Sequence, residues 1–170
     1  MSAARKTRAA RRHWLLKSEP GTFSFDDLWR AKGRTTVWSG VRNFQARNLL
    51  RDELAAGDGV LFYHSSADPS GVAGLARVVG AGHPDPTQFD PKDPGHDPES
   101  TRDAPRWFAV DVQALRKLPR FVALEELRAE PRLAGMVLLR RGSRLSVQPV
   151  TSAEWGVVLA LGGLERDPTT

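Results

Sequence analysis

The fold depends first on the stretch Gly59-Val60-Leu61-Phe62-Tyr63-His64-Ser65. Its apolar and aromatic residues, followed by the turn residues Asp68-Pro69-Ser70-Gly71, are typical of a β-strand that ends in a tight turn. Because side chains alternate between the two faces of a strand, Tyr63 and Ser65 are expected on one face and His64 on the other. The sequence therefore predicts a strand over residues 59–65 whose two faces carry different side chains.

Further strands and short helices are predicted on both sides of this stretch. Extended segments are expected over residues 13–18, 35–38, 72–81, 106–118 and 144–150. Helices are expected over residues 24–29, 41–54, 124–129 and 133–139, and from the capping box at residues 151–154 to Gly162. Since helices do not alternate strictly with strands, we expect an α+β fold with a curved, mostly antiparallel sheet of about five or six strands and short helices packed around it.

Length and composition restrict the class of protein. A chain of 170 residues can form one domain with a real hydrophobic core. The absence of cysteine excludes disulfides and cysteine-ligated metal sites. No apolar run approaches the ~20 residues that span a bilayer, and the basic start has no signal-peptide pattern. We therefore expect a cytoplasmic monomer without a cofactor.

The net charge of +5 belongs to one end of the chain. Residues 1–12 carry several basic side chains and no acid, whereas the remainder is formally neutral. We expect residues 1–12 to be a disordered tail that either adds salt-sensitive phosphate contacts or only aids solubility. The domain itself is expected over residues 13–165, followed by a short tail over 166–170.

The segment Trp38-Ser39-Gly40-Val41-Arg42-Asn43 is the strongest candidate for chemistry. Ser39 or Gly40 is expected to cap the following helix, whose free N–H groups suit an anion or the acceptor edge of a base. Arg42 would then lie in the first turn, where the helix dipole disfavours a cation by up to ~1 kcal/mol. This placement indicates either a phosphate contact or a solvated side chain. Trp38 offers a stacking face for a base, whereas the other tryptophans fit core positions.

Two further clusters and one loop are weaker candidates. Lys17-Ser18-Glu19 could form an ion pair, a base-reading pair or an acid–base couple. Arg144, with the polar side chains that alternate after it, could line a groove or face solvent. The histidines lack metal-ligand spacing, and the acidic, proline-rich loop 83–105 lacks a calcium-loop pattern, so no metal is expected. That loop is instead predicted to be a surface loop, or a lid over the site.

Taken in order, residues 14–20, 38–48, 62–65 and 144–150 resemble the motifs of the EVE domain, a family within the PUA-like superfamily. The resemblance extends over nearly the whole chain and implies a PUA-like pseudobarrel that recognises a modified base, chiefly a modified cytosine in DNA. Carried over by motif, the base pocket comprises Ser18, Trp38, Ser39, Asn43, Tyr63, His64 and Ser65, and the nucleic-acid path comprises Lys17, Arg42 and Arg144. Including His64 conflicts with the alternation that directs it away from Tyr63.

The resemblance predicts a non-catalytic reader that binds nucleic acid weakly, with DNA favoured over RNA. Several alternatives stay open. A small amidohydrolase acting on N-acylated cytidine-type nucleosides could use Lys17 and Glu19 as base and acid, with Ser18 or Ser65 as the hydroxyl partner. A reader of modified RNA is a second alternative, and a protein-interaction domain without nucleic-acid binding is a third.

Overall fold

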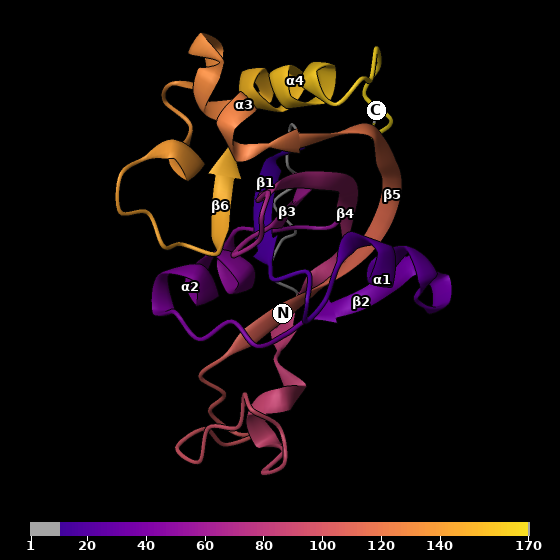
Figure 1. Cartoon of the computed structure of the whole chain (residues 1–170). Helices are drawn as coiled ribbons and strands as arrows, with labels where there is room; N and C mark the ends of the chain where they lie inside the picture. The colour runs from indigo at the N-terminus through magenta and orange to yellow at the C-terminus, as the bar shows by residue number, and fades with distance from the viewer. Residues whose placement is uncertain (1–10, 170) are drawn as a thin grey trace.

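The computed structural model describes residues 11–169, so the predicted basic tail lies almost wholly outside the described residues. A six-stranded sheet has the order β2-β5-β4-β3-β1-β6. Its strands are β1 (His13–Ser18), β2 (Thr35–Trp38), β3 (Gly59–His64), β4 (Gly71–Pro84), β5 (Phe108–Ala123) and β6 (Val147–Val150). The α-helices are α1 (Phe25–Arg30), α2 (Phe44–Asp52), α3 (Leu124–Ala129) and α4 (Ser152–Leu161). Figure 1 shows α1 and α2 towards one end of the curved sheet and α3 and α4 towards the other, which confirms the predicted α+β architecture.

The sheet is mostly antiparallel, as predicted, with a parallel pairing of β1 with β3. Strands β4 and β5 are longer than expected, and their pairing shifts register at three places. An extra residue in one strand of a pair bends and twists that strand. These irregularities therefore account for the curvature of the sheet.

Two hydrophobic cores lie on opposite faces of the sheet. Val60 and Phe62 of β3 pack in the first core with α1 and α2, whereas Leu61 and Tyr63 pack in the second core with α3 and α4. Strand β1 alternates in the same way: Trp14 and Leu16 lie in the first core and Leu15 lies in the second. The apolar sequence of the central strands thus reflects burial on both faces, which is why a simple polar–apolar alternation is missing there.

Helix ends follow the sequence where a local capping box exists. Ser24 caps α1 and Thr151 caps α4, each through reciprocal hydrogen bonds with the acid three residues later. The predicted helix over residues 133–139 is wrong. This segment forms two short 3₁₀ turns, Pro131–Leu133 and Val137–Leu139, on either side of Gly135. Leu133, at the end of the first turn, and Met136, between the two turns, are both buried, and this explains the apolar pattern that suggested a helix.

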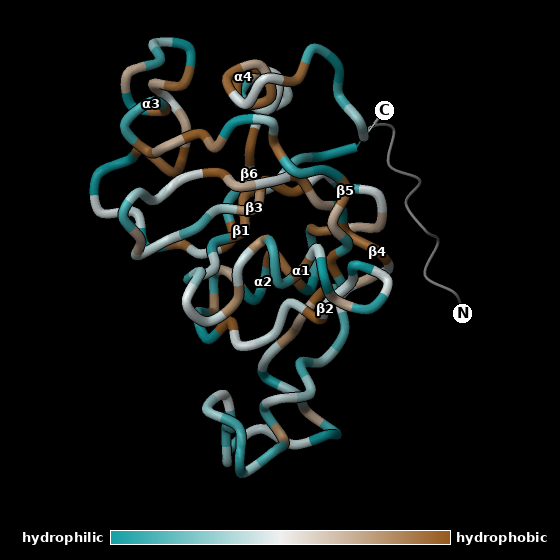
Figure 2. The backbone as a smooth tube through the Cα atoms, turned by 45° about the vertical axis from the view of Figure 1, so that its right-hand side comes forward, coloured by the Kyte–Doolittle hydropathy of each residue, from teal (hydrophilic) through white to brown (hydrophobic). Residues whose placement is uncertain are grey.

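The connection between β4 and β5 projects away from the sheet and is largely hydrophilic (Figures 1 and 2). It contains one 3₁₀ turn, Pro86–Phe89, and returns at Trp107. Within residues 11–169, no helix is long and apolar enough to cross a membrane. The same residues contain no group of three or more His, Asp or Glu side chains placed to hold a metal ion.

Candidate functional site

A cavity of about 480 Å³ opens where the end of β1 faces β2 and the segment after it. Its walls comprise Lys17, Ser18, Thr22, Phe23, residues 36–42 and Ser146. Pockets for small molecules occupy roughly 300–1,000 Å³ and combine apolar walls with a few polar groups. Size and lining therefore suit a ligand with a single flat ring system.

The apolar wall of the cavity is built on β2. Trp38 is 7 % exposed, and its ring meets the ring of Phe62 edge-on at 5.3 Å. Val37 is 40 % exposed, which is unusual for a large apolar side chain in this molecule. Trp38 thus belongs both to the first core and to the cavity, and its position is fixed before any ligand arrives.

The polar wall is built on the end of β1. The Ser18 hydroxyl donates a hydrogen bond to the Phe23 carbonyl oxygen at 2.6 Å and so holds the following turn beside the strand. Lys17 is half-buried, and burial lowers the pKa of its ammonium group. Among residues 11–169, its ammonium group has no ion pair or hydrogen bond. A partly desolvated cation without an acceptor is poised to interact with a ligand oxygen.

The segment between β2 and α2 begins its helix later than predicted. Asn43, not Ser39 or Gly40, is the N-cap, and its side-chain oxygen accepts a hydrogen bond from the Ala46 N–H at 2.9 Å. Gly40 has a φ of 84°, a left-handed conformation that favours glycine, and its N–H donates to Asp85 Oδ2 at 2.7 Å. This contact with a distant loop keeps residues 40–42 out of the helix.

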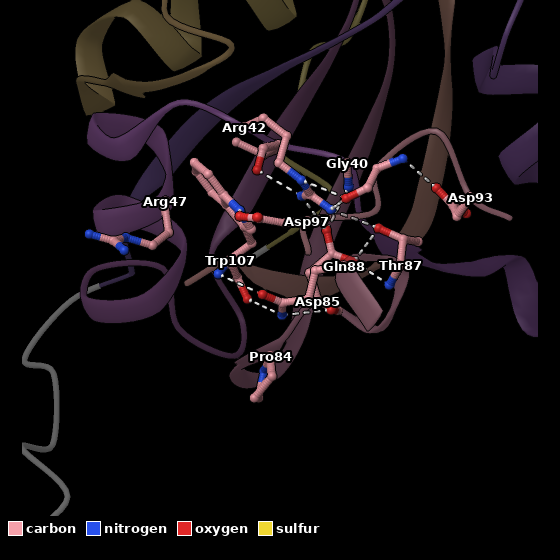
Figure 3. A network of polar contacts seen from close by, with 12 residues as sticks. Gly40, Arg42, Arg47, Pro84, Asp85, Thr87, Gln88, Asp93, Asp97 and Trp107 are labelled. Atoms are coloured by element: carbon pink, nitrogen blue, oxygen red, sulfur yellow. Dashed lines mark hydrogen bonds and ion pairs between the residues drawn. The ribbon is translucent and has the colours of Figure 1, made fainter. Parts of the chain in front are cut away.

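Arg42 is bound into the cluster around Asp85 (Figure 3). Its Nη1 donates to Asp85 Oδ2 at 2.9 Å, and its Nη2 donates to the Thr87 hydroxyl at 3.0 Å and the Gly95 carbonyl at 2.6 Å. Burial opposes ionisation of Asp85, but hydrogen bonds from Thr87, Gly40 and Arg42 outweigh it and lower the pKa of the carboxyl group. The expectation that Arg42 is a first-turn cation free for phosphate is therefore wrong, because its guanidinium group fixes the rim of the cavity.

The same cluster continues into the acidic loop. Gln88 Nε2 donates to the carbonyl oxygens of Asp85 and Trp107, both at 2.8 Å, and its Oε1 accepts from the Ser100 hydroxyl. The Trp107 indole donates to Asp97 at 2.7 Å. Loop 83–105 is thus folded around buried polar contacts and supports the cavity rim from outside. The surface-loop prediction holds, and the lid alternative has no support in these contacts.

The end of β3 does not line the cavity, although Tyr63, His64 and Ser65 were predicted to do so. Tyr63 faces the second core and is 3 % exposed. His64 lies on the opposite face, where its Nε2 accepts a hydrogen bond from the Phe25 N–H at 3.1 Å, and burial lowers its pKa. The Ser65 N–H donates to the Ser18 carbonyl oxygen. Strand alternation, set aside by the motif-based assignment, accounts for both orientations.

The other predicted site residues divide between two hollows. Ser18, Trp38 and Ser39 line the cavity, and Lys17 lines it too, not an outer path. Asn43 and Arg144 line a neighbouring groove of about 400 Å³. The residues predicted from the motifs thus fall in two separate hollows.

Several cavity and support residues carried no usable local signal. Thr36 and Val37 come from a strand that was predicted, but its edge position was not. Ser146 was read as one polar residue of an alternating strand. Asp85 was one acid among many in a proline-rich loop, and its partner Gly40 lies 45 residues away along the chain. Only the folded arrangement singles these residues out.

Comparisons with known proteins match almost the whole domain. The EVE domain family matches residues 12–161. Human thymocyte nuclear protein 1 is 42 % identical over 174 residues, covering 92 % of this chain and 76 % of the human protein. The crystal structure of human THYN1 in complex with DNA containing 5-methylcytosine is 42 % identical, with a TM-score of 0.83, and covers 91 % of this chain and 99 % of that one. A Pseudomonas syringae protein of solved structure is 43 % identical, with a TM-score of 0.83, and covers 88 % and 99 % of the two chains.

Proposed function

The chain belongs to the EVE domain family, and from that premise we propose that it is a non-catalytic reader that holds a modified cytosine of DNA in the cavity beside Trp38. The similarity to a protein crystallised with 5-methylcytosine-containing DNA supports DNA as the partner. The base would lie in the cavity, and the rest of the strand would lie on the surrounding surface.

One observation carries the assignment of the base to this cavity. Lys17, whose half-buried ammonium group has no partner among the described residues, lines the same hollow as Trp38. A cytosine ring presents a flat apolar face together with a carbonyl oxygen and a ring nitrogen that accept hydrogen bonds. Stacking on an aromatic side chain contributes about 1–3 kcal/mol per base. The Lys17 ammonium group would satisfy an acceptor on the edge of that base.

Recognition of the modification rests on the apolar wall. A methyl group transferred from water to apolar surface contributes about 0.8 kcal/mol, which corresponds to roughly fourfold in affinity. Val37 and Trp38 supply such a surface in the cavity. We therefore expect a several-fold preference for the methylated base. Removing a base from a duplex costs a few kcal/mol, so a single strand should bind more tightly than a matched duplex.

The amidohydrolase alternative is less well supported. The Ser18 hydroxyl donates to a backbone carbonyl, and among residues 11–169 no hydrogen bond joins the side chains of Lys17 and Glu19. Activation of a hydroxyl nucleophile needs a base within hydrogen-bonding reach. The relatives described above likewise support binding of DNA over hydrolysis.

The experiment is a titration of the whole chain, followed by tryptophan fluorescence, with single-stranded DNA and RNA oligonucleotides. Each carries one central cytosine, 5-methylcytosine or 5-hydroxymethylcytosine. We expect methylated DNA to bind several-fold more tightly than unmodified DNA. Equal affinity for all the bases would overturn the proposal, and tighter binding of the methylated RNA would favour the RNA reader. Release of a nucleoside product from an N-acylated cytidine would revive the hydrolase.

A further inference from the structure

The formally neutral domain segregates its charges along the chain. Residues 28–51 and 131–153 contain no Asp or Glu, although both stretches contain several arginines. The first stretch supplies β2, the cavity rim and the start of α2, and the second supplies the segment that leads into β6. Acidic residues are concentrated instead in the connection between β4 and β5. The two stretches meet in a groove beside the cavity, and the lining of that groove contains arginines and no acid.

Their meeting point forms the neighbouring groove of about 400 Å³. Asn43 and Gln45 at the start of α2 form one side, and Val137 with residues 140–145 forms the other. The groove lies next to the cavity, because Asn43 of the groove directly follows Arg42 of the cavity and Leu145 of the groove directly precedes Ser146 of the cavity. In Figure 1, the segment that leads into β6 ends beside α2. A ligand in the cavity would therefore reach the groove within a short distance.

The arginine side chains of this groove make no polar contact that stabilises the fold among the described residues. Arg140, Arg141 and Arg144 are exposed, and among the described residues none of their guanidinium groups forms an ion pair or hydrogen bond. In contrast, Arg42 and Arg106 hold buried or partly buried acids. The described residues that line the groove include no acid that would offset the repulsion between these like charges. Such a cluster is complementary to an anion.

Local conformation directs these side chains to one place. Gly142 has a φ of 75°, which reverses the chain between Arg141 and Ser143. The reversal lets residues on both sides of the turn line the same groove. The amide groups of Asn43 and Gln45 and the hydroxyl of Ser143 add neutral donors. Guanidinium groups surrounded by neutral donors favour phosphate oxygens, which arginine binds with two parallel hydrogen bonds.

We propose that this groove binds the sugar–phosphate backbone beside the base held in the cavity, through Arg140, Arg141 and Arg144. The inference rests on the proposed function, and it adds which part of the surface holds the strand and which side chains bind it. Backbone contacts carry no sequence information, whereas base contacts do. The groove should therefore supply affinity and salt dependence, and the cavity should supply the preference for the modified base.

The test compares two double variants of the whole chain that remove the same charge. Arg140→Gln with Arg141→Gln changes the groove, whereas Arg128→Gln with Arg166→Gln changes exposed arginines outside the groove and the cavity. Each variant is titrated with a labelled single-stranded oligonucleotide that contains either 5-methylcytosine or cytosine, at several salt concentrations. Thermal unfolding checks that both variants remain folded.

We expect the groove variant to lose about tenfold in affinity for both oligonucleotides and its plot of log K against log salt to flatten by about 0.7 per lost phosphate contact. Its ratio of affinities for methylated and unmodified DNA should equal that of the wild type, and the control should match the wild type throughout. Equal losses in the two variants, or a changed ratio with unchanged salt dependence, would overturn the inference. A wild type without any preference, combined with loss only in the groove variant, would contradict the proposed function and leave the groove assignment standing.

Discussion

The polar cluster around Asp85 and the cavity beside Trp38 lie on either side of residues 40–42 and use their polar groups in opposite ways. In the cluster, both oxygens of the Asp85 carboxylate and the Gln88 amide are hydrogen-bonded inside the protein. Lys17 and Ser39 line the cavity, and among residues 11–169 neither the Lys17 ammonium group nor the Ser39 hydroxyl has a partner. The first region is complete without a ligand, whereas the second has unmet hydrogen-bonding capacity.

This difference separates supporting residues from binding residues. Polar groups buried without partners cost about 1–3 kcal/mol each, so a closed cluster must be satisfied internally and then becomes rigid. Polar groups in an open cavity are hydrogen-bonded to water, so they cost little stability until a ligand replaces that water. Mutations in the cluster should therefore reduce stability, and mutations in the cavity should reduce binding.

Asp85→Asn should give the largest effect, because it leaves the Arg42 guanidinium group without its anion. Breaking a buried pair costs about 3–5 kcal/mol, and partial exposure of Arg42 reduces this to about 3 kcal/mol. Urea unfolding at pH 7 measures the change. Asp103→Asn, an exposed acid of the same loop, should change the free energy of unfolding by less than about 0.5 kcal/mol. Similar values for the two variants would remove the distinction between the regions.

Lys17→Met should produce the opposite pattern. Losing a charged hydrogen bond to the base should weaken binding roughly tenfold, whereas stability should stay equal or rise, since a half-buried ammonium group is removed. Burial lowers the pKa of Lys17, so wild-type affinity should fall as pH rises through that lowered value, and the variant should lose this pH dependence. Lys92→Met, at an exposed lysine, is the matched control. Unchanged affinity in Lys17→Met would place the base elsewhere.

Gly40→Ala tests the link between the two regions. A Cβ at this position meets no atom within 4 Å, so any cost comes from the left-handed φ of 84°. We expect a loss of about 1 kcal/mol in unfolding free energy together with weaker binding, because the rim would shift. Gly21→Ala, which has equal space and no such φ, should be neutral. A stable Gly40→Ala variant with normal affinity would show that the rim tolerates movement.

His64→Gln should give the smallest effect, visible only in acid. Burial lowers the pKa of His64 in the folded state, so the folded protein disfavours the charged form. Wild-type stability should therefore decline as pH falls below about 6.5, by up to ~1 kcal/mol near pH 5. Glutamine can still accept the bond from Phe25 without titrating, so the decline should be smaller. His13, whose pKa burial also lowers, should retain part of the slope. An unchanged acid slope would exclude His64 as a source.

The fold was predictable where the deciding interactions are local. The helix start at Ser24, the capping box at Thr151 and the alternation of residues 60–63 are properties of neighbouring residues, and the structure confirms them. The start of α2 was not predictable, because Asp85 decides it across 45 residues. The sequence predicted Ser39 or Gly40 as the cap, and the structure has Asn43.

The sequence predicted some of the residues that line the cavity but not which side of a strand each residue faces. Motif resemblance led to Ser18, Trp38 and Ser39, which line the cavity, and also to Tyr63, which faces the other core. Motifs record which residues recur together, and they do not say on which side of a strand each one lies. Alternation along the strand supplied that information, and it predicted the orientations of Tyr63 and His64 correctly.

The most direct test of the central claim observes the indole N–H signals of the tryptophans in an NMR spectrum of ¹⁵N-labelled protein. Trp38→Phe assigns the Trp38 signal while keeping an aromatic ring in the core. On addition of the 5-methylcytosine oligonucleotide, we expect the Trp38 signal to shift and the signal of Trp155, which lies in the second core, to stay in place. Saturable binding that leaves the Trp38 signal unmoved would show that the base lies outside the cavity.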